Sequence, residues 1–474
     1  MNMEIFNTAS KQIEPIQTNV SGKANFYSCG PTVYNFTHIG NLRAFITADI
    51  LVRALELNGI QTRWVMNITD IDDKTINGTL SMFGNEADTD KLAQFTRTYT
   101  KAFMKDLEET GVDKDKIEFV NVSDVIPEIQ KFILRLIDLG FAYKAEDGST
   151  YFSISKYQEK FGTYGALVGA DFLAGTKPGA GARISSDEYD KENIADFALW
   201  KAHVPNDGNI YWDHPILGMG RPGWHIECTL INYLKFPLGT DIHSGGIDLI
   251  FPHHTNEIAQ AEPIYRPFVR QWLHSGHIMV DGKKMSKSLG NFYTLEDVKN
   301  KHLGDGQSLR FLILQSHYKS KLNVTEESLL AAKAGLNNIR AQIKQILNNH
   351  WDSAIEKPAT DNEFVAKLHE YMSSDLDTPS ALALISEIFK SNLSDKEKIN
   401  TFKEFEDILG LVLIAPTAEE KLEIPAEVAT LIKERDTART EKDYSHSDKL
   451  RKEIEKFGFE VLDTSDGTKV QKLS

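Results

Sequence analysis

A strand, a helix and a second strand are predicted by residues 23–70, KANFYSCGPTVYNFTHIGNLRAFITADILVRALELNGIQTRWVMNITD. Residues 24–29 and 62–70 are the strand candidates, and residues 41–59 are the helix candidate. Parallel strands are joined by a crossover helix, so this unit predicts a parallel α/β sheet. The helix is supported by apolar side chains that recur at near-helical spacing, at Leu42, Phe45, Ile46, Leu51 and Leu55.

The chain contains only two cysteines, Cys29 and Cys228. A chain of 474 residues with two cysteines is not a disulfide scaffold, so these thiols are either buried and inert or serve one specific purpose. Cys29 falls at the carboxyl end of the first predicted strand, and Thr69 falls at the end of the second. Ligands of parallel α/β sheets bind beyond these strand ends, which makes both residues candidate site residues.

The composition limits the classes of protein to which the chain can belong. Its 474 residues predict roughly three or four domains. The formal net charge of −15 argues against a general basic nucleic-acid binder, although a local basic surface can still bind a specific RNA. The sequence has no apolar run near the ~18 residues of a membrane span and no signal-peptide pattern at its N-terminus. We therefore expect a cytoplasmic protein without a membrane partner.

Further predicted elements divide the first two thirds of the chain. Residues 90–140 are predicted to be largely helical, and residues 142–154 to form a hairpin. Residues 160–190 are rich in glycine and alanine and are expected to be irregular. We interpret residues 120–220 as an insertion, after which strand and turn signals return at 223–295.

The remainder of the chain is predicted to be mostly helical. An amphipathic helix begins after Thr325, which is a candidate N-cap. Beyond this helix we expect a loop at residues 351–362 and two helices at 380–393 and 401–414. A linker at 416–425, a charged helix at 426–443, one more helix, and a strand and turn at 459–470 are expected to follow.

A histidine motif lies between the first strand and the helix, at residues 38–41, His-Ile-Gly-Asn. Free N–H groups at a helix N-terminus favour anions, His38 can donate to a phosphate oxygen, and Gly40 lets a flat base lie against the backbone. Alone, four such residues favour an ordinary turn with a solvated histidine.

A second motif, at residues 281–291, is DGKKMSKSLGN. Its two lysines, Lys284 and Lys287, together with serine hydroxyls, suit the triphosphate of ATP and the charge that builds as pyrophosphate leaves. A solvated basic loop is the alternative, but the order Lys-Met-Ser-Lys-Ser is far more specific than two lysines. With the histidine motif it predicts an enzyme that consumes ATP and forms an adenylate.

A metal site is suggested by the two cysteines, Cys29 and Cys228, together with the pair His253 and Glu257. If a helix begins at Pro252, the last two side chains share one face, and a mixture of sulfur, nitrogen and oxygen donors suits zinc. Inert thiols and structural histidines, His254 among them, remain equally compatible with the spacing.

Three carboxylates follow the second strand, at Asp70, Asp72 and Asp73. A Mg²⁺ site is conceivable there, but an acidic loop or helix start is the favoured interpretation.

The chain resembles the cysteinyl-tRNA synthetase family in motifs that occur in the order CGPTVYNFTHIGNLR, NITDIDDK, GRPGWHIEC, DIHSGGIDLIFPHHTNEIAQAE and KMSKSLGN. The resemblance covers essentially the whole chain and includes SSDLDTPSALA and the DTSDGTKV tail. It implies a class I synthetase of α/β fold with a Rossmann-type catalytic domain in two halves, an inserted connective domain, a stem-contact segment with a helical bundle, and a small α+β anticodon-binding domain. The implied boundaries are 1–120 and 221–300 for the catalytic halves, 121–220 for the insertion, 301–415 for the stem-contact segment and bundle, and 416–474 for the anticodon-binding domain.

The resemblance also implies the site residues. One zinc ion per subunit would be held by Cys29, Cys228, His253 and Glu257. Asp248 would face the ammonium group of the substrate, in a cysteine pocket lined by Gly30, Thr69, Trp224 and Asp248. His38, Lys284 and Lys287 would be catalytic, with Mg²⁺ accompanying the ATP. ATP would contact Pro31, His38, Gly40, Asn41, Lys287 and Ser288.

Two parts of the sequence leave questions open. Asn41 stands where the class pattern has histidine, which leaves a phosphate contact at that position unassigned. The stretch 165–195 aligns poorly with any part of the family. The residues that read the anticodon are also open, the basic candidates being Lys433, Arg435, Arg439, Lys449, Arg451 and Lys452.

The implied reaction converts ATP, L-cysteine and tRNA(Cys) to AMP, diphosphate and cysteinyl-tRNA(Cys), catalysed by a monomer. A ligase that joins cysteine to an amino sugar on the same core is the alternative, although such enzymes lack the C-terminal RNA-binding part. A zinc-stabilised RNA-binding protein without catalysis is a third interpretation, and the two nucleotide motifs argue against it.

Overall fold

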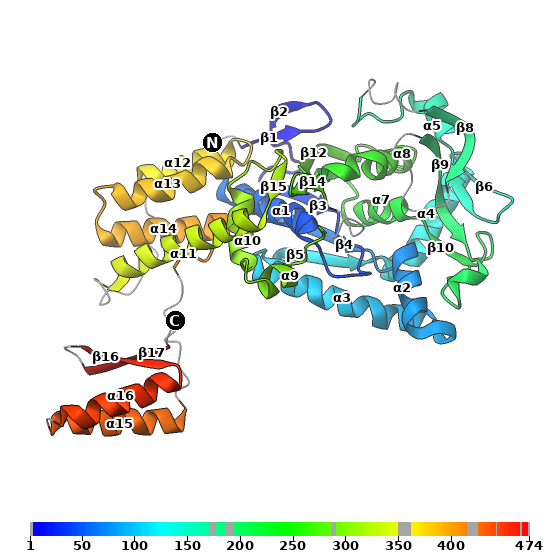
Figure 1. Ribbon diagram of the computed structural model, residues 1–474. Helices are drawn as coiled ribbons and strands as arrows, with labels where there is room; N and C mark the ends of the chain where they lie inside the picture. Colours follow the sequence, from blue (N-terminus) through cyan, green and yellow to red (C-terminus); the bar gives the residue numbers. More distant parts are fainter. Residues whose placement is uncertain are drawn as a thin grey trace. The chain divides into compact units, whose positions relative to one another are not determined.

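The chain forms two compact units, Met1–Ile414 and Ala415–Ser474, in this computed structural model (Figure 1). The structure describes residues 3–169, 177–184, 193–285, 291–348, 362–414, 425–441, 443–464 and 467–472. Nearly all of the predicted loop at 351–362 and of the predicted linker at 416–425 lies outside these residues. Within them, no helix is long and apolar enough to span a membrane.

A five-stranded parallel sheet forms the centre of the first unit, in the order β12–β11–β3–β4–β5. Helix α1 (Ile39–Leu57) is the crossover from β3 to β4, which confirms the predicted strand–helix–strand unit and the α/β class. Gly59 follows its C-cap with a φ of 73°. The strands are β3 (Lys23–Ser28), β4 (Gln61–Ile68), β5 (Ile117–Asn121), β11 (Thr240–Gly246) and β12 (Val269–Ser275).

The strand order reverses direction between β3 and β11. From β3 the chain proceeds outward to β4 and β5, whereas from β11 it proceeds to β12 on the other side. Loops that leave the carboxyl ends of two such neighbouring strands diverge and leave a crevice between them, which is the usual ligand site of an open α/β sheet. Cys29 follows β3 directly, and β11 ends at Gly246.

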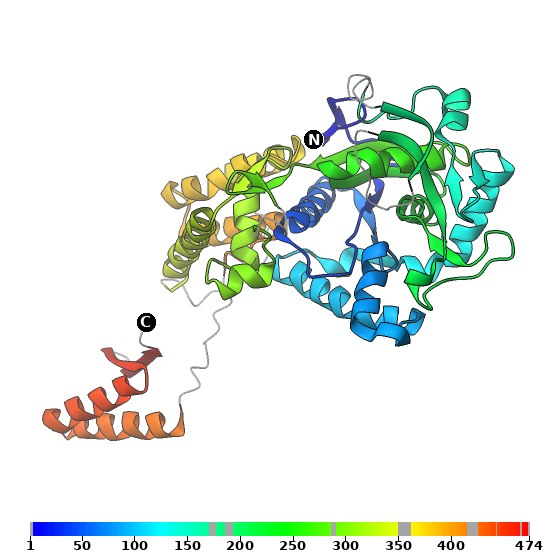
Figure 2. The same ribbon diagram turned by 45° about the vertical axis from the view of Figure 1, so that its right-hand side comes forward.

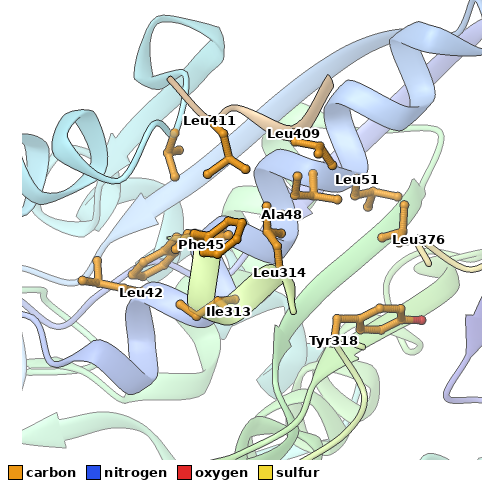
Figure 3. Close-up of a cluster of buried hydrophobic side chains, with 14 of the residues drawn as sticks. Leu42, Phe45, Ala48, Leu51, Ile313, Leu314, Tyr318, Leu376, Leu409 and Leu411 are labelled. Atoms are coloured by element: carbon orange, nitrogen blue, oxygen red, sulfur yellow. The ribbon is translucent and has the colours of Figure 1, made fainter. Parts of the chain in front are cut away.

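Helix α1 is buried on several sides because the sheet covers one side and helices cover another. All five of its predicted apolar positions are buried. Figure 3 shows Leu42, Phe45, Ala48 and Leu51 of α1 among side chains that include Ile313 and Leu314 of α10 (Gly306–Leu314). This cluster belongs to one continuous core that joins the five-stranded parallel sheet, called the catalytic sheet below, to the helices that follow it.

One prediction in the first half is incomplete. Residues 90–140 contain the helices α3 (Thr89–Glu109) and α4 (Ile126–Asp138), but β5 lies between them. Five residues are too few to show a distinct period, and their strand conformation depends on pairing with β4, far away in sequence. Helix α2 (Asp73–Phe83) precedes α3.

A second sheet, in the order β10–β9–β7–β6, is formed by residues between 142 and 222. The hairpin predicted at 142–154 is confirmed by the antiparallel pairing of β6 with β7. The irregular structure expected at 160–190 is wrong for β8, because pairing with β9 holds this glycine-rich segment extended. The elements are β6 (Ala142–Lys144), β7 (Thr150–Phe152), α5 (Ile154–Phe161), β8 (Lys177–Ile184), β9 (Asn193–Ala202) and β10 (Gly220–Pro222).

A three-stranded sheet, β14–β13–β15, and a group of helices follow the catalytic sheet. The Thr325 hydroxyl accepts a hydrogen bond from the Ser328 N–H at 3.0 Å, which confirms Thr325 as the N-cap of α11. Helices α11 to α14, coloured yellow-green to orange, lie together in Figures 1 and 2. The elements are β13 (Ile278–Val280), β14 (Lys283–Lys284), α9 (Leu295–Asn300), β15 (Leu322–Val324), α11 (Glu326–Asn348), α12 (Glu363–Ser373), α13 (Thr378–Lys390) and α14 (Asp395–Leu409).

The second unit has its own small core, formed by Val428, Ile454, Phe459 and Val461. It contains the predicted charged helix, a second helix and a terminal β-hairpin. Their bounds are α15 (Ala426–Thr440), α16 (Tyr444–Lys456), β16 (Phe459–Thr464) and β17 (Gly467–Lys472). In the first unit, a further hairpin, β1 (Glu4–Asn7) with β2 (Gln12–Pro15), lies at the start of the chain.

A buried ion pair joins α1 to the helices that follow the catalytic sheet. Arg310 Nη2 of α10 lies 2.5 Å from Asp49 Oδ2 of α1, and both side chains are almost completely buried. Arg310 Nε also donates to the Leu409 carbonyl at 2.7 Å. Burial alone would raise the pKa of Asp49, but Arg310 and Arg53 outweigh it and hold this pKa below its usual value.

We expect Arg310→Met to lower the free energy of unfolding of the first unit by about 3–5 kcal/mol, because it leaves the Asp49 carboxylate buried without its main partner. Urea unfolding followed by circular dichroism measures this loss. The matched control is Arg53→Met, which removes the more exposed arginine beside Asp49 and should cost less, about 1–2 kcal/mol. Equal losses in the two variants would contradict the role given to Arg310.

Candidate metal centre and nucleotide site

The predicted site residues meet at the carboxyl ends of three adjacent strands. Cys29 and Gly30 follow β3, Thr69 follows β4, and Asp248 lies in the turn after β11. The backbone ties two of these ends together, since the Thr69 N–H donates to the Pro31 carbonyl at 3.1 Å. The structure therefore places the candidate residues around the crevice where the strand order reverses.

Both cysteines lie in this crevice, and both are buried with free thiols. Cys29 Sγ is 3.8 Å from Cys228 Sγ, which comes from α7 (Trp224–Lys235). Cys29 Sγ is also 3.2 Å from His254 Nε2 and 4.0 Å from Glu257 Oε1. Among the described residues, one donor atom each from Cys29, His253, His254 and Glu257 lie within 4.8 Å of one another, a group that contains His254 in place of the expected Cys228.

The pair His253 and Glu257 is together as predicted, although the local structure differs. His253 Nε2 lies 3.1 Å from Glu257 Oε1. The helix α8 begins at Thr255 rather than at Pro252, and an irregular helical turn, Ile250–His254, precedes it. Phe251 in this turn is extended, with φ −137° and ψ 131°, and His253 and His254 after it both contribute to the cluster.

The surroundings favour neutral forms for most of the cluster. Burial raises the pKa of the Glu257 carboxyl and of the Cys29 thiol well above their usual values. Burial likewise lowers the pKa of His254 well below its usual value. Burial would also raise the pKa of Cys228, but the hydrogen bond from Cys29 and the neighbouring His253 outweigh it and lower that pKa. Neutral imidazoles and a thiol that ionises readily are the forms that bind a metal cation.

The geometry fits a tetrahedral zinc ion with mixed ligands. Two sulfur ligands of one zinc lie about 3.8 Å apart when each Zn–S bond is about 2.3 Å, and this matches the separation of the two cysteine sulfurs. Glu257 Oε2 and His243 Nδ1 are buried without a hydrogen-bond partner in the described part of the chain. These two atoms lie 3.8 Å apart, and a cation held by Glu257 would satisfy its carboxylate.

Further aromatic and histidine rings enclose the cluster. Trp224, the first residue of α7, stacks on His253 with ring centroids 4.4 Å apart. His254 Nδ1 lies 2.8 Å from His274 Nε2, and His225 Nδ1 lies 3.0 Å from His253 Nδ1. The sequence analysis missed His225 and His274. Their signal is present in the sequence as polar residues inside otherwise apolar strands and helices.

His38 is the N-cap of α1. Its Nδ1 accepts a hydrogen bond from the Asn41 N–H at 3.2 Å, so in the neutral ring the proton resides on Nε2. A Cβ atom at Gly40 would lie 2.8 Å from His38 Nδ1, so the absence of a side chain at Gly40 accommodates the histidine ring. The Asn41 side chain is exposed, and its backbone N–H is the group that orients His38.

The two nucleotide motifs meet in space. The His38 ring packs edge-on against Phe292, with ring centroids 5.1 Å apart, and the Ile39 N–H donates to the Tyr293 carbonyl at 2.9 Å. Met285 lies 3.5 Å from the position of a Cβ atom at Gly40. Met285 and the residues Phe292 and Tyr293, on either side of residues 286–290, therefore lie at the N-terminus of α1. Lys284 is the second residue of β14, while Lys287 and Ser288 lie outside the described residues.

The three carboxylates after β4 face different partners. Asp70 accepts hydrogen bonds from Ser123, Asp72 caps α2 by accepting from the Lys74 N–H, and Asp73 pairs with Arg221. These contacts agree with the interpretation as an acidic loop and helix start.

One basic candidate for anticodon contact is wrongly chosen. Arg435 is 1% exposed and lies beside Asp436, so its side chain belongs to the core of the second unit. Helical periodicity did not separate this buried arginine from its solvated neighbours.

Two family models match most of this chain. Residues 15–334 match the family described as tRNA synthetases class I (C) catalytic domain, and residues 422–470 match the cysteinyl-tRNA ligase anticodon binding domain. The cysteine–tRNA ligase of Chlamydia felis is 38% identical over 100% of this chain and 98% of its own length. That of Chlamydia muridarum is 39% identical over the full length of both chains.

Solved structures share the fold at low identity. The Mycobacterium tuberculosis methionyl-tRNA synthetase in complex with methionyl-adenylate has a TM-score of 0.54 at 14% identity, covering 82% of this chain and 90% of its own. The LeuRS of Agrobacterium radiobacter K84 has a TM-score of 0.54 at 12% identity, covering 83% of this chain and 84% of its own. On the family matches and the full-length relatives, this chain belongs to the cysteine–tRNA ligase family of class I aminoacyl-tRNA synthetases.

Proposed function

We propose that this chain activates L-cysteine with ATP and transfers it to the 3′-terminal ribose of tRNA(Cys). The observation that carries the proposal is the buried cluster of Cys29, Cys228, His253 and Glu257 at the carboxyl ends of the strands. The cluster supplies sulfur-selective chemistry, and the helix N-terminus supplies an anion site. The family matches support the same reaction.

The four cluster residues are the proposed zinc ligands, with His254 beside Cys29 as the nearest further donor. Zinc, when bound, would hold the substrate sulfur as a thiolate and so favour cysteine over serine, which shape alone separates poorly. Trp224 covers His253 and can limit access of water to this part of the pocket. Gly30, Thr69 and Asp248 complete the proposed cysteine pocket.

ATP is proposed to bind at the N-terminus of α1. His38 Nε2 carries the proton of the neutral ring and can donate it in a hydrogen bond to a phosphate oxygen. Pro31, Gly40 and Asn41 would contact the nucleotide through the backbone. Lys284, Lys287 and Ser288, with Mg²⁺, would balance the charge on the leaving pyrophosphate.

The proposed reaction has two steps. A carboxylate oxygen of cysteine attacks the α-phosphorus of ATP, the bond to the bridging oxygen breaks, and pyrophosphate leaves with the electron pair. A ribose hydroxyl of the tRNA then attacks the carbonyl carbon, loses its proton, and AMP leaves. The residues contribute mainly by positioning the reactants and stabilising charge.

The second unit is the proposed anticodon reader, and its match to an anticodon binding domain favours tRNA over the amino-sugar alternative. The division of residues 1–414 into catalytic halves, an insertion from 121 to 220 and a stem-contact bundle from 301 remains a proposal. A cytoplasmic monomer is likewise proposed.

We expect Lys287→Ala to lower the rate of cysteine-dependent ATP–pyrophosphate exchange by at least about 100-fold, because one positive charge that stabilises the leaving pyrophosphate is lost. The wild-type protein should exchange with cysteine and not with serine. The matched control is Lys283→Ala, a neighbouring exposed lysine, which should retain the wild-type rate. Normal exchange in Lys287→Ala would remove the assignment of this loop.

We expect Cys228→Ser and Glu257→Gln to lose most of their bound zinc and to raise the KM for cysteine. Plasma mass spectrometry of dialysed protein measures the zinc content, which should be about one per chain in the wild type. Asp241→Asn is the matched control, because the Asp241 carboxyl is similarly buried but accepts hydrogen bonds from the Asn19 and Asn25 backbone N–H groups. Wild-type zinc content in Cys228→Ser would exclude Cys228 as a ligand.

A further inference from the structure

A buried chain of hydrogen bonds runs behind the proposed cysteine pocket. The Gly30 N–H donates to Asn67 Oδ1 at 2.8 Å, Asn67 Nδ2 donates to Thr69 Oγ1 at 2.9 Å, and Thr69 Oγ1 donates to Glu227 Oε2 at 2.8 Å. Asn67, Thr69 and Glu227 are each at most 1% exposed, whereas Gly30 is partly exposed. The sequence analysis assigned no role to Asn67 or Glu227.

The orientation of the Asn67 amide follows from its neighbours. The Gly30 N–H is a backbone donor that cannot reverse, so the atom facing it must be the amide oxygen. The Tyr27 hydroxyl, 3.2 Å from the same oxygen, adds a second contact. The amide nitrogen must then face Thr69. The backbones of Gly30 and Asn67 also approach closely, because a Cβ atom at Gly30 would lie 1.7 Å from the backbone carbonyl oxygen of Asn67.

The Thr69 hydroxyl has one orientation left. It accepts from the Asn67 amide nitrogen, so its single proton is directed to the Glu227 carboxylate. A hydroxyl can donate once and accept twice, which leaves Thr69 one lone pair and no donor. Gly30 is in the same position, since its N–H is used by Asn67 while its carbonyl oxygen has no donor within the described residues.

We propose that Asn67 and Glu227 are positioning residues that make the Gly30–Thr69 wall of the pocket an acceptor surface for the substrate ammonium group. This inference rests on the proposed function. A wall with acceptors alone attracts a cation that carries hydrogens and repels a carboxylate. The amino acid is therefore held with its ammonium toward Gly30 and Thr69, and its carboxylate is left to face the N-terminus of α1, where the α-phosphate must lie.

The inference separates substrate analogues that differ in one group. Cysteamine has the thiol and the ammonium, whereas 3-mercaptopropionate has the thiol and the carboxylate. We expect Thr69→Val, which keeps the shape and loses the hydroxyl, to weaken cysteine and cysteamine about 10- to 100-fold, as for the loss of a charge-assisted hydrogen bond. Affinity for 3-mercaptopropionate should change less than about twofold.

Glu227 is tested by a pair of variants. Glu227→Leu frees the Thr69 proton to rotate and should weaken the two amines in the same way as Thr69→Val. Glu227→Gln keeps an acceptor oxygen and should restore most of the affinity. Calorimetric titration of zinc-supplemented protein with each ligand measures these constants, and the KM for cysteine in pyrophosphate exchange should rise with little change in kcat.

Two results would overturn the inference. Equal weakening of all three ligands by Thr69→Val would mean that the hydroxyl supports the pocket without reading the ammonium, and unchanged cysteamine binding would mean that it makes no contact. Because Thr69→Val conserves volume, it keeps the test valid if Glu227→Leu fails to fold. Failure of the proposed function is seen separately, as a wild-type protein without cysteine-dependent exchange.

Discussion

The structure depends on one constraint, which is the burial of two thiols, several imidazoles and a carboxyl in one crevice of the sheet. Such groups are costly to bury unless each is paired, and Glu257 Oε2 and His243 Nδ1, 3.8 Å apart, have no hydrogen-bond partner within the described residues. A divalent cation would resolve this imbalance. The reversal of strand order between β3 and β11 creates the crevice, so the position of the cluster depends on the parallel sheet.

The same sheet edge carries both proposed substrate sites. The N-terminus of α1 presents His38 with its proton on Nε2, and the flanks of the lysine motif close against it through Phe292 and Met285. The opposite part of α1 is fixed by the buried pair of Asp49 and Arg310. Helix α1 therefore connects the nucleotide site to the helices that follow the catalytic sheet.

Much of this arrangement could be predicted from the sequence, because the strand–helix–strand unit, the amphipathic helix after Thr325 and the motifs are local patterns. Spacing alone left open whether the two cysteines, His253 and Glu257 bind a metal, and the resemblance to a family turned them into a specific zinc ligand set. Strand β5, strand β8 and the buried Arg435 were missed because distant pairing and packing decide them. Asn67 and Glu227 were missed because a hydrogen-bond network has no sequence period.

The central claim is that the cluster selects cysteine through its sulfur. X-ray absorption at the zinc edge counts the sulfur ligands directly, in the protein alone and with each amino acid. The account predicts two sulfurs in the free protein, from Cys29 and Cys228, a third when cysteine binds, and no change with serine. A count that stays at two with saturating cysteine would contradict it.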